Sequence, residues 1–109
     1  MGKFAKIVVY VPVANADRIR EVLANCGCGH IGNYDFCSFS VKGIGRFRPL
    51  KGAAPHIGKV GKIEEVAEER IETICLEKNL KKVLAEVRKA HPYEEPAIDI
   101  YPLLNGFLL

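Results

Sequence analysis

The chain has 109 residues, of which 49% are hydrophobic and 27% charged, and its formal net charge is +3. These values are ordinary for one globular domain with a single apolar core, so we expect one domain over residues 1–109. A charge this small does not indicate nucleic-acid binding. No apolar run approaches the ~20 residues that cross a bilayer. The N-terminus lacks the long apolar segment of a secretory signal, so we expect a cytoplasmic protein with reduced cysteines.

Periodicity and punctuation predict four strands and two helices. The expected strands cover residues 4–12, 34–42, 69–76 and 97–101, and the expected helices cover 16–26 and the segment from 80 to the turn at Pro92. Asn15 and Asn79 suit the N-caps, and Gly27 suits the position after the first helix. The segment 43–61 is rich in Gly and Pro, which is typical of a long functional or disordered connection.

The predicted order is β-α-β-β-α-β, which is the ferredoxin-like pattern of an α+β two-layer sandwich. We therefore expect an antiparallel four-stranded sheet with both helices on one face. The first strand is apolar on both sides, and an apolar tail runs from Pro102 to Leu109. Both features favour an oligomer that buries the open face of the sheet, although the tail could also fold back on its own sheet.

The hexapeptide His91-Pro92-Tyr93-Glu94-Glu95-Pro96 carries an imidazole, a phenol and two carboxylates between two prolines. The prolines stiffen this stretch and stop a helix from running through it. Pro92 suits the second position of a type I turn, which would bring the side chains of His91 and Glu94 together. Such a turn would be either a ligand-binding corner or a simple connection from helix to strand.

Several motifs together resemble one known family. They are Gly29-His30-Ile31-Gly32-Asn33-Tyr34, Cys37-Ser38-Phe39, Gly45-Arg46-Phe47-Arg48-Pro49, Gly58-Lys59-Val60-Gly61-Lys62-Ile63-Glu64, and the hexapeptide with Ala97. This pattern resembles the domain inserted in bacterial Nif-three-like dinuclear-metal proteins, which also occurs as a free-standing protein of the YqfO type. The resemblance implies a PII/CutA-like fold and a homo-oligomer, because both of those families are ferredoxin-like and trimeric. The two-metal site of the family belongs to the host domain, so we do not transfer a dimetal hydrolase role.

The segment 43–62 is the first candidate site. No acidic residue lies between Asp35 and Glu64, whereas six cations do: Lys42, Arg46, Arg48, Lys51, Lys59 and Lys62. Arg46 and Arg48, with Lys59 and His56, could bind a small anion. The alternative is a solvated basic loop that pairs with the glutamates after it, or that packs on a neighbouring subunit.

Two other candidates concern metals. His91, Glu94 and Glu95, with His56 from elsewhere, are ordinary ligands for a divalent metal ion. Alternatively, His91 caps the carbonyls that end the second helix, and Glu94 bonds His91 or a backbone N–H. The spacing Cys26-x-Cys28-x-His30 suits a soft metal such as Cu(I), but Cys26 also belongs to the apolar stripe of the first helix.

These observations favour a non-enzymatic oligomer, a trimer or a dimer, of PII/CutA-like modules. Its expected task is the regulatory binding of a small anion, a metal ion or a protein partner at the clefts between subunits. One alternative is a subunit or accessory domain of a metal-dependent hydrolase that acts with a Nif-three-like host protein. Another is a purely structural oligomerisation domain.

Overall fold

The computed structural model describes residues 3–104. Its elements are β1 (Phe4–Pro12), α1 (Ala16–Asn25), β2 (Phe39–Phe47), β3 (Glu64–Leu76), α2 (Leu80–Ala90) and β4 (Ile98–Pro102), with the short 3₁₀ turns η1 (Val13–Asn15) and η2 (Glu77–Asn79) before the helices. The predicted order of strands and helices is therefore confirmed. Both helices start where the sequence predicts, but neither Asn15 nor Asn79 makes a side-chain cap hydrogen bond.

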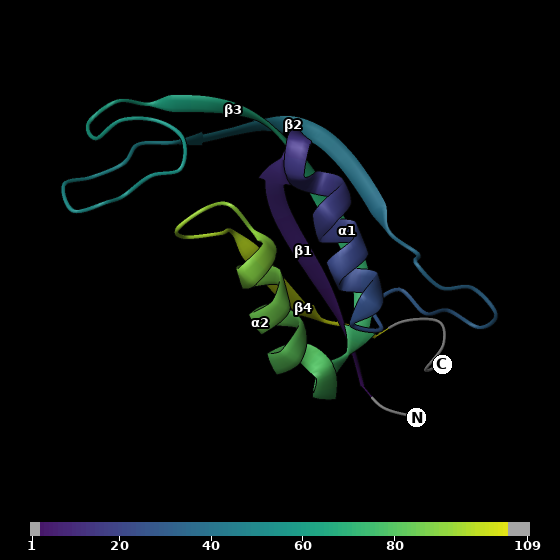
Figure 1. Ribbon diagram of the computed structural model, residues 1–109. Helices are drawn as coiled ribbons and strands as arrows, with labels where there is room; N and C mark the ends of the chain where they lie inside the picture. Colours follow the sequence, from purple (N-terminus) through teal and green to yellow (C-terminus); the bar gives the residue numbers. More distant parts are fainter. Residues whose placement is uncertain (1–2, 105–109) are drawn as a thin grey trace.

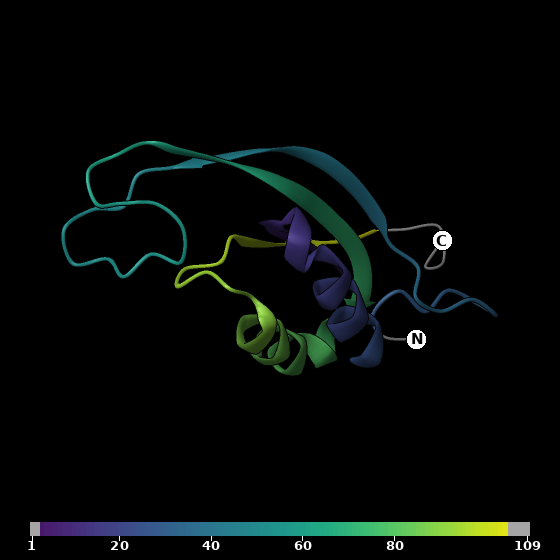
Figure 2. The same cartoon turned by 45° about the horizontal axis from the view of Figure 1, so that its top comes forward.

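The four strands form one antiparallel sheet in the order β2-β3-β1-β4. Figures 1 and 2 show both helices on the same face of this sheet, and the β2–β3 hairpin extending beyond them. The central strand β1 sets the register, since Val9 is opposite Ile71 of β3 and Ile98 of β4. This is the expected ferredoxin-like α+β sandwich.

The apolar core lies between the sheet and the two helices. Alternate residues of β1 point toward the helices and are fully buried, together with apolar residues of the helices and β3. These residues include Ile7, Val9, Val11, Ile19, Leu23, Ile71, Val83 and Val87. Each of them stabilises the fold by about 1.5–3 kcal/mol through burial. This face of β1 therefore fixes how the helices sit over the sheet.

The open face of the sheet is only partly covered. Val8 lies on this face and is fully buried within the single chain. Phe39, Val41 and Tyr101 share the face by register and stay largely exposed. The expected burial of this face in an oligomer stays a prediction. Most of the apolar tail, including Phe107, Leu108 and Leu109, lies outside the described residues.

The boundaries of β2 and β3 differ from those predicted. The second strand begins at Phe39 instead of residue 34, and it continues through Gly43 and Gly45 to Phe47. Phe36 has a φ of 57°, which interrupts any extended run before it. The third strand begins at Glu64 instead of residue 69, and it pairs with the whole of β2. Backbone pairing thus overrides the poor strand propensity of the glycines, and the connection shrinks to residues 48–63.

The segment after α1 is fixed by a tightly packed glycine. The helix ends at Asn25, and Gly27 follows with a φ of 90° as predicted. Gly29 donates a backbone hydrogen bond of 2.7 Å to the carbonyl of Ile74, and its own carbonyl accepts one of 3.0 Å from Cys37. With a φ of 75° and the backbone of Cys37 directly against its Cα, Gly29 leaves no room for a side chain.

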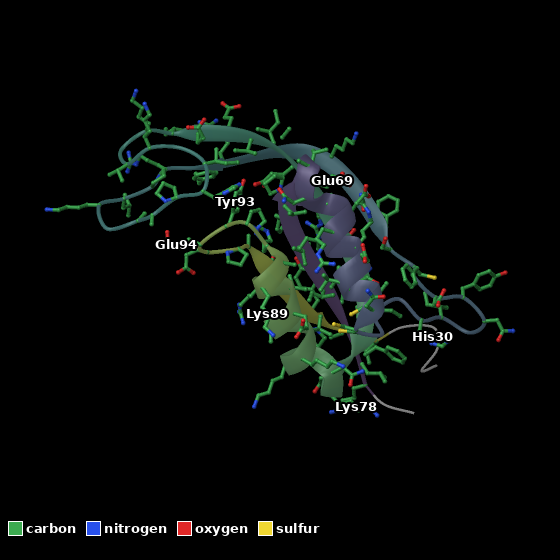
Figure 3. All side chains as sticks on the ribbon, viewed as in Figure 1. His30, Glu69, Lys78, Lys89, Tyr93 and Glu94 are labelled. Carbon is green, nitrogen blue, oxygen red and sulfur yellow. The ribbon has the colours of Figure 1, made fainter. Side chains whose placement is uncertain are left out.

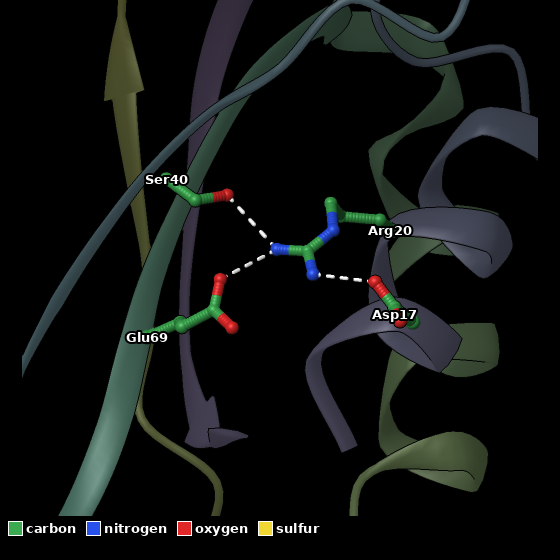
Figure 4. A network of polar contacts seen from close by, with 4 residues as sticks. All are labelled: Asp17, Arg20, Ser40 and Glu69. Carbon is green, nitrogen blue, oxygen red and sulfur yellow. Dashed lines mark hydrogen bonds and ion pairs between the residues drawn. The ribbon is translucent and has the colours of Figure 1, made fainter. Parts of the chain in front are cut away.

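A polar network ties α1 to the sheet (Figure 4). Nη1 of Arg20 donates to Oε1 of Glu69 at 2.7 Å and to Oγ of Ser40 at 3.0 Å, and Nη2 donates to Asp17 at 2.6 Å. Contacts with Asp17 and Glu69 raise the pKa of Arg20. Glu69 is only 7% exposed, so its charge depends on this guanidinium for compensation.

None of the helices that the structure describes has both the length and the apolar composition needed to span a membrane.

Candidate functional site

The turn that follows α2 crosses the end of β1. The backbone N–H of Tyr10 donates to the carbonyl of Ala97 at 3.1 Å, which closes the turn onto the sheet. Nε2 of His91 lies 2.7 Å from the carbonyl oxygen of Tyr10, and the N–H of Tyr93 donates to Nδ1 of His91 at 3.1 Å. His91 is thus a buried brace between the turn and β1, with both ring nitrogens engaged by the main chain.

These contacts define the protonation of His91. A ring whose Nδ1 accepts and whose Nε2 donates is the neutral tautomer. Burial lowers the pKa of His91, while the hydrogen bond to Tyr10 and the nearby Glu68 act in the opposite direction. The expected capping of helix carbonyls by this side chain is wrong, because the ring reaches β1 instead. Only the backbone N–H of His91 bonds the helix, at the carbonyl of Val87.

Tyr93 connects the turn to β3. Its hydroxyl donates a hydrogen bond of 2.7 Å to Oε2 of Glu68. Burial and this carboxylate raise the pKa of Tyr93, so the phenol stays a donor. The ring of Tyr93 also meets Phe47 edge-on, with centroids 5.8 Å apart, and lies 6.4 Å from the ring of His56. The turn is therefore packed against the β2–β3 hairpin.

These groups enclose a cleft of about 590 Å³ between the hairpin and the turn, which we call the hairpin cleft. Its lining is Tyr10, Gly45, Arg46, Phe47, Arg48, Pro49, Leu50, Ala53, Pro55, His56, Ile57, Glu68, Tyr93, Glu94, Glu95 and Ala97. Most of these residues are apolar or aromatic, and five carry a formal charge: Arg46, Arg48, Glu68, Glu94 and Glu95. This volume falls within the range of about 300–1,000 Å³ that is typical of pockets for small molecules. Figure 3 shows Tyr93 and Glu94 on the turn, close to the loop that joins β2 and β3.

The charged groups of the cleft divide between its two sides. Arg46 and Arg48 are exposed on the hairpin side, and neither makes an ion pair with any described residue. The alternative in which the basic segment pairs with the following glutamates is thus not what the described residues show. On the turn side, Oε2 of Glu94 accepts a hydrogen bond of 2.9 Å from the N–H of Ala54. This bond to a backbone N–H was one of the two partners expected for Glu94.

The structure brings together some of the predicted site residues and separates others. Arg46, Arg48 and His56 line the hairpin cleft with Glu94 and Glu95, but Lys59 does not. Among residues 3–104, no three His, Cys, Asp or Glu side chains are grouped so that they could hold a metal ion.

The candidate Cys26-x-Cys28-x-His30 arrangement is not among any groups of metal-ligand side chains in the described residues, because none is found there. Cys28 is buried, and its contact with Cys75 and its burial raise the pKa of its thiol, which disfavours the thiolate that binds metals. His30 is exposed and its Nε2 lies 2.9 Å from the carbonyl of Gly32 in its own turn. Cys26 packs against the apolar core, as its place in the helix stripe suggests.

Among the cleft residues that sequence reasoning did not propose as site residues are Tyr10, Phe47 and Glu68. Glu68 was one glutamate in an acidic run, and Tyr10 was one aromatic residue in an apolar strand. Strand alternation combined with the correct bounds of β2 would have placed Glu68 opposite Gly43, on the same face as Gly45. That pairing of a carboxylate with glycines was the available signal.

Fold and site together define a small ferredoxin-like α+β domain with a preformed, largely apolar cleft. No family model matches the chain. It is 53% identical over 100 residues to a GTP cyclohydrolase 1 type 2 homolog of Halalkalibacterium halodurans, covering 92% of this chain and 27% of that protein. The corresponding Bacillus subtilis homolog is 50% identical over 98 residues, or 90% of this chain and 26% of the relative. The chain thus spans about a quarter of the length of these curated relatives.

Solved structures agree with this similarity. A Bacillus cereus protein related to NIF3 superposes with a TM-score of 0.83 at 45% identity, over 95% of this chain and 26% of that one. The divalent cation tolerance protein CutA of Archaeoglobus fulgidus gives a TM-score of 0.69 at 21% identity, over 94% of this chain and 86% of that one. The second likeness concerns the fold alone. The chain is therefore homologous to a domain of the YqfO-type, Nif-three-like proteins and has a CutA-like fold, as its motifs indicate.

Proposed function

We propose that the chain is a regulatory binding module, and that the hairpin cleft takes a small ligand with an anionic group. One observation carries this proposal: Arg46 and Arg48, which have no ion-pair partner among the described residues, stand at the edge of a mostly apolar cleft. Arg46 lies near the end of β2 and Arg48 directly follows the strand, and two arginines this close along the chain can bind a phosphate or carboxylate. The apolar lining then holds the rest of the ligand.

The site is better suited to binding than to a reaction. His91 has both nitrogens engaged by the main chain, so it offers no free base to a substrate. The phenol of Tyr93 is held by Glu68 and has a raised pKa. We keep the divalent metal as a prediction for the assembled protein, where a neighbouring copy would have to complete the ligand set.

The proposal is tested with phenyl phosphate, which joins a flat ring to an anion. Amide chemical shifts in NMR report its binding and its location. Replacing both Arg46 and Arg48 by Ala should weaken binding by about tenfold or more, because two charge-assisted hydrogen bonds at an exposed site are worth more than ~1.4 kcal/mol together. The matched control replaces Lys81 and Lys82 by Ala, since both are exposed at the far end of α2.

The control variant should bind phenyl phosphate like the wild type. Equal affinity in the arginine double variant, or shifts that map away from the hairpin cleft, would overturn the proposed function. Circular dichroism of both double variants confirms that neither change unfolds the domain.

The comparisons support a partner for this module. Because the chain matches 27% of its relative from H. halodurans, 73% of that protein is a different region. We propose that the module acts with such a host region in the cytoplasm.

We also propose that the module assembles as a trimer or dimer through the open face of the sheet. Light scattering after gel filtration, with Phe39→Lys as the disrupting variant, measures that assembly. A wild-type monomer at high concentration would contradict it.

A further inference from the structure

Glu68 is a buried carboxylate with one oxygen unused. The residue is 8% exposed, and its Oε2 accepts the hydrogen bond from Tyr93. No described residue donates a hydrogen bond to Oε1, which lies directly over the Cα of Gly45. A buried carboxylate oxygen without a donor is uncommon, because desolvation of a polar group is costly and that of a charged group is costlier still. This oxygen therefore has capacity for a donor that the described chain does not supply.

No cation of the described chain compensates this charge. Arg70 lies on the same face of β3, but its guanidinium is used by Oη of Tyr10 at 3.0 Å and by Glu72 at 3.2 Å. Arg46 lines the same cleft and makes no ion pair. The charge of Glu68 acts to raise the pKa of His91, but the two backbone contacts of the ring hold His91 neutral.

Aromatic rings surround the same space. Tyr10, Phe47, His56 and Tyr93 all line the hairpin cleft with Glu68. The faces of aromatic rings attract cations, and this attraction is stronger where the cation is desolvated. A carboxylate among aromatic rings is thus a favourable environment for an organic cation and an unfavourable one for an anion.

We infer that Glu68, Tyr93 and Phe47 form a subsite of the hairpin cleft for an organic cation, an ammonium or guanidinium group. The inference rests on the cleft being a binding site, as proposed above, but not on anion binding by the two arginines. With Arg46 and Arg48 at the edge, the preferred small ligand is a zwitterion whose cationic end enters toward Glu68. The same cation could instead be a Lys or Arg side chain of a second copy of this chain.

Three fragments of similar shape distinguish the contribution of charge to affinity from that of size: benzylammonium, benzyl alcohol and benzoate. Their affinities for the wild type are measured by NMR titration at neutral pH. Benzylammonium should bind about tenfold more tightly than benzyl alcohol, and benzoate should be the weakest at this subsite. Glu68→Gln should remove the preference for the cation, while the amide keeps an acceptor for the Tyr93 hydroxyl.

A second variant perturbs Glu68 without changing it. A Cβ at position 45 would occupy the place of the Glu68 carboxyl group, whereas a Cβ at position 43 would meet nothing within 4 Å. Both glycines lie in β2 on the same face. Gly45→Ala should therefore displace the carboxylate and reduce benzylammonium binding about fivefold or more, and Gly43→Ala should leave it unchanged.

The source of the cation is decided by the oligomeric state. If a second copy supplies it, the wild-type oligomer shows no preference for benzylammonium, and Glu68→Gln weakens association about tenfold in light scattering. Either that result or the fragment preference supports the subsite. Equal binding of benzylammonium and benzyl alcohol, together with unchanged association of Glu68→Gln, would overturn it. Failure of phenyl phosphate binding alone would refute the anion-binding proposal and leave this inference standing.

Discussion

His91→Ala should strongly destabilise the domain, because His91 joins α2, the turn and β1. The variant removes the hydrogen bonds of 2.7 Å to Tyr10 and 3.1 Å from Tyr93. Each main-chain group left behind costs about 1 kcal/mol, at the low end of the usual range because water can reach the half-buried tyrosines. Loss of the buried ring adds about 1 kcal/mol. We therefore expect the free energy of unfolding to fall by about 3 kcal/mol, and the melting temperature by roughly 12 °C or more.

Urea unfolding followed by circular dichroism at fixed protein concentration measures this change. His30→Ala is the matched control, because His30 is exposed and, among the described residues, its side chain hydrogen-bonds the carbonyl of Gly32 in its own turn. That control should change the unfolding free energy by less than about 0.5 kcal/mol. A loss below about 1 kcal/mol in His91→Ala would refute the assignment of His91 as a structural brace.

Acidification provides an independent check on the same residue. The pKa of His91 in the folded chain is lowered from its ordinary value of 6.5, so the unfolded chain takes up the proton more readily. The stability that His91 contributes is complete above pH 6.5 and is lost as the pH falls through the folded pKa, by at most ~1.4 kcal/mol per pH unit. The stability gap between the wild type and His91→Ala should narrow accordingly below pH 6.5. A gap that widens would mean that His91 is charged in the fold and paired with Glu68.

Two further pairs of variants test the packing around α1. Gly29→Ala should lower the free energy of unfolding by about 3 kcal/mol or prevent folding, because it adds backbone strain and a clash with the main chain. Gly27→Ala should lower it by only ~1–2 kcal/mol, because the strain of its positive φ is not accompanied by a clash. Urea unfolding measures both changes. Equal losses of unfolding free energy in the two variants would show that the close packing at Gly29 does not contribute to stability. Arg20→Ala should cost about 2 kcal/mol, because it leaves a buried carboxylate uncompensated, and the exposed Arg18→Ala should cost less than about 0.5 kcal/mol in thermal unfolding. A comparable loss in the two arginine variants would contradict the role given to the buried network.

The order of elements and the fold were predictable because they depend on local signals. Helical spacing located both helices, with Asn15 and Gly27 flanking the first and Asn79 and Pro92 the second, and the β-branched run located β1. The bounds of β2 and β3 were harder to predict from the sequence. Gly43 and Gly45 are typical of loops, yet they lie within β2 because the adjacent β3 supplies hydrogen bonds along its whole length. The strand propensities of single residues carry no information about such pairing.

The cleft was predictable only in part. The sequence indicated the arginines of the hairpin and the stiff turn after α2 as candidate sites, and the structure places both on one cleft. It did not indicate Glu68, because without the bounds of β2 a run of glutamates does not show which of them lies opposite the glycines.

The sequence by itself determined the architecture, since apolar periodicity, glycine and proline act within a few residues of one another. Only the tertiary structure decided the roles of His91, Glu68 and Tyr93. His91 is 81 positions from Tyr10 along the chain, and Tyr93 is 25 positions from Glu68. The sheet register and the path of the turn bring these partners together. The fold then determines that His91 is a neutral brace and that Oε1 of Glu68 has no hydrogen-bond donor among the described residues, because desolvation and hydrogen-bond partners are properties of the folded environment.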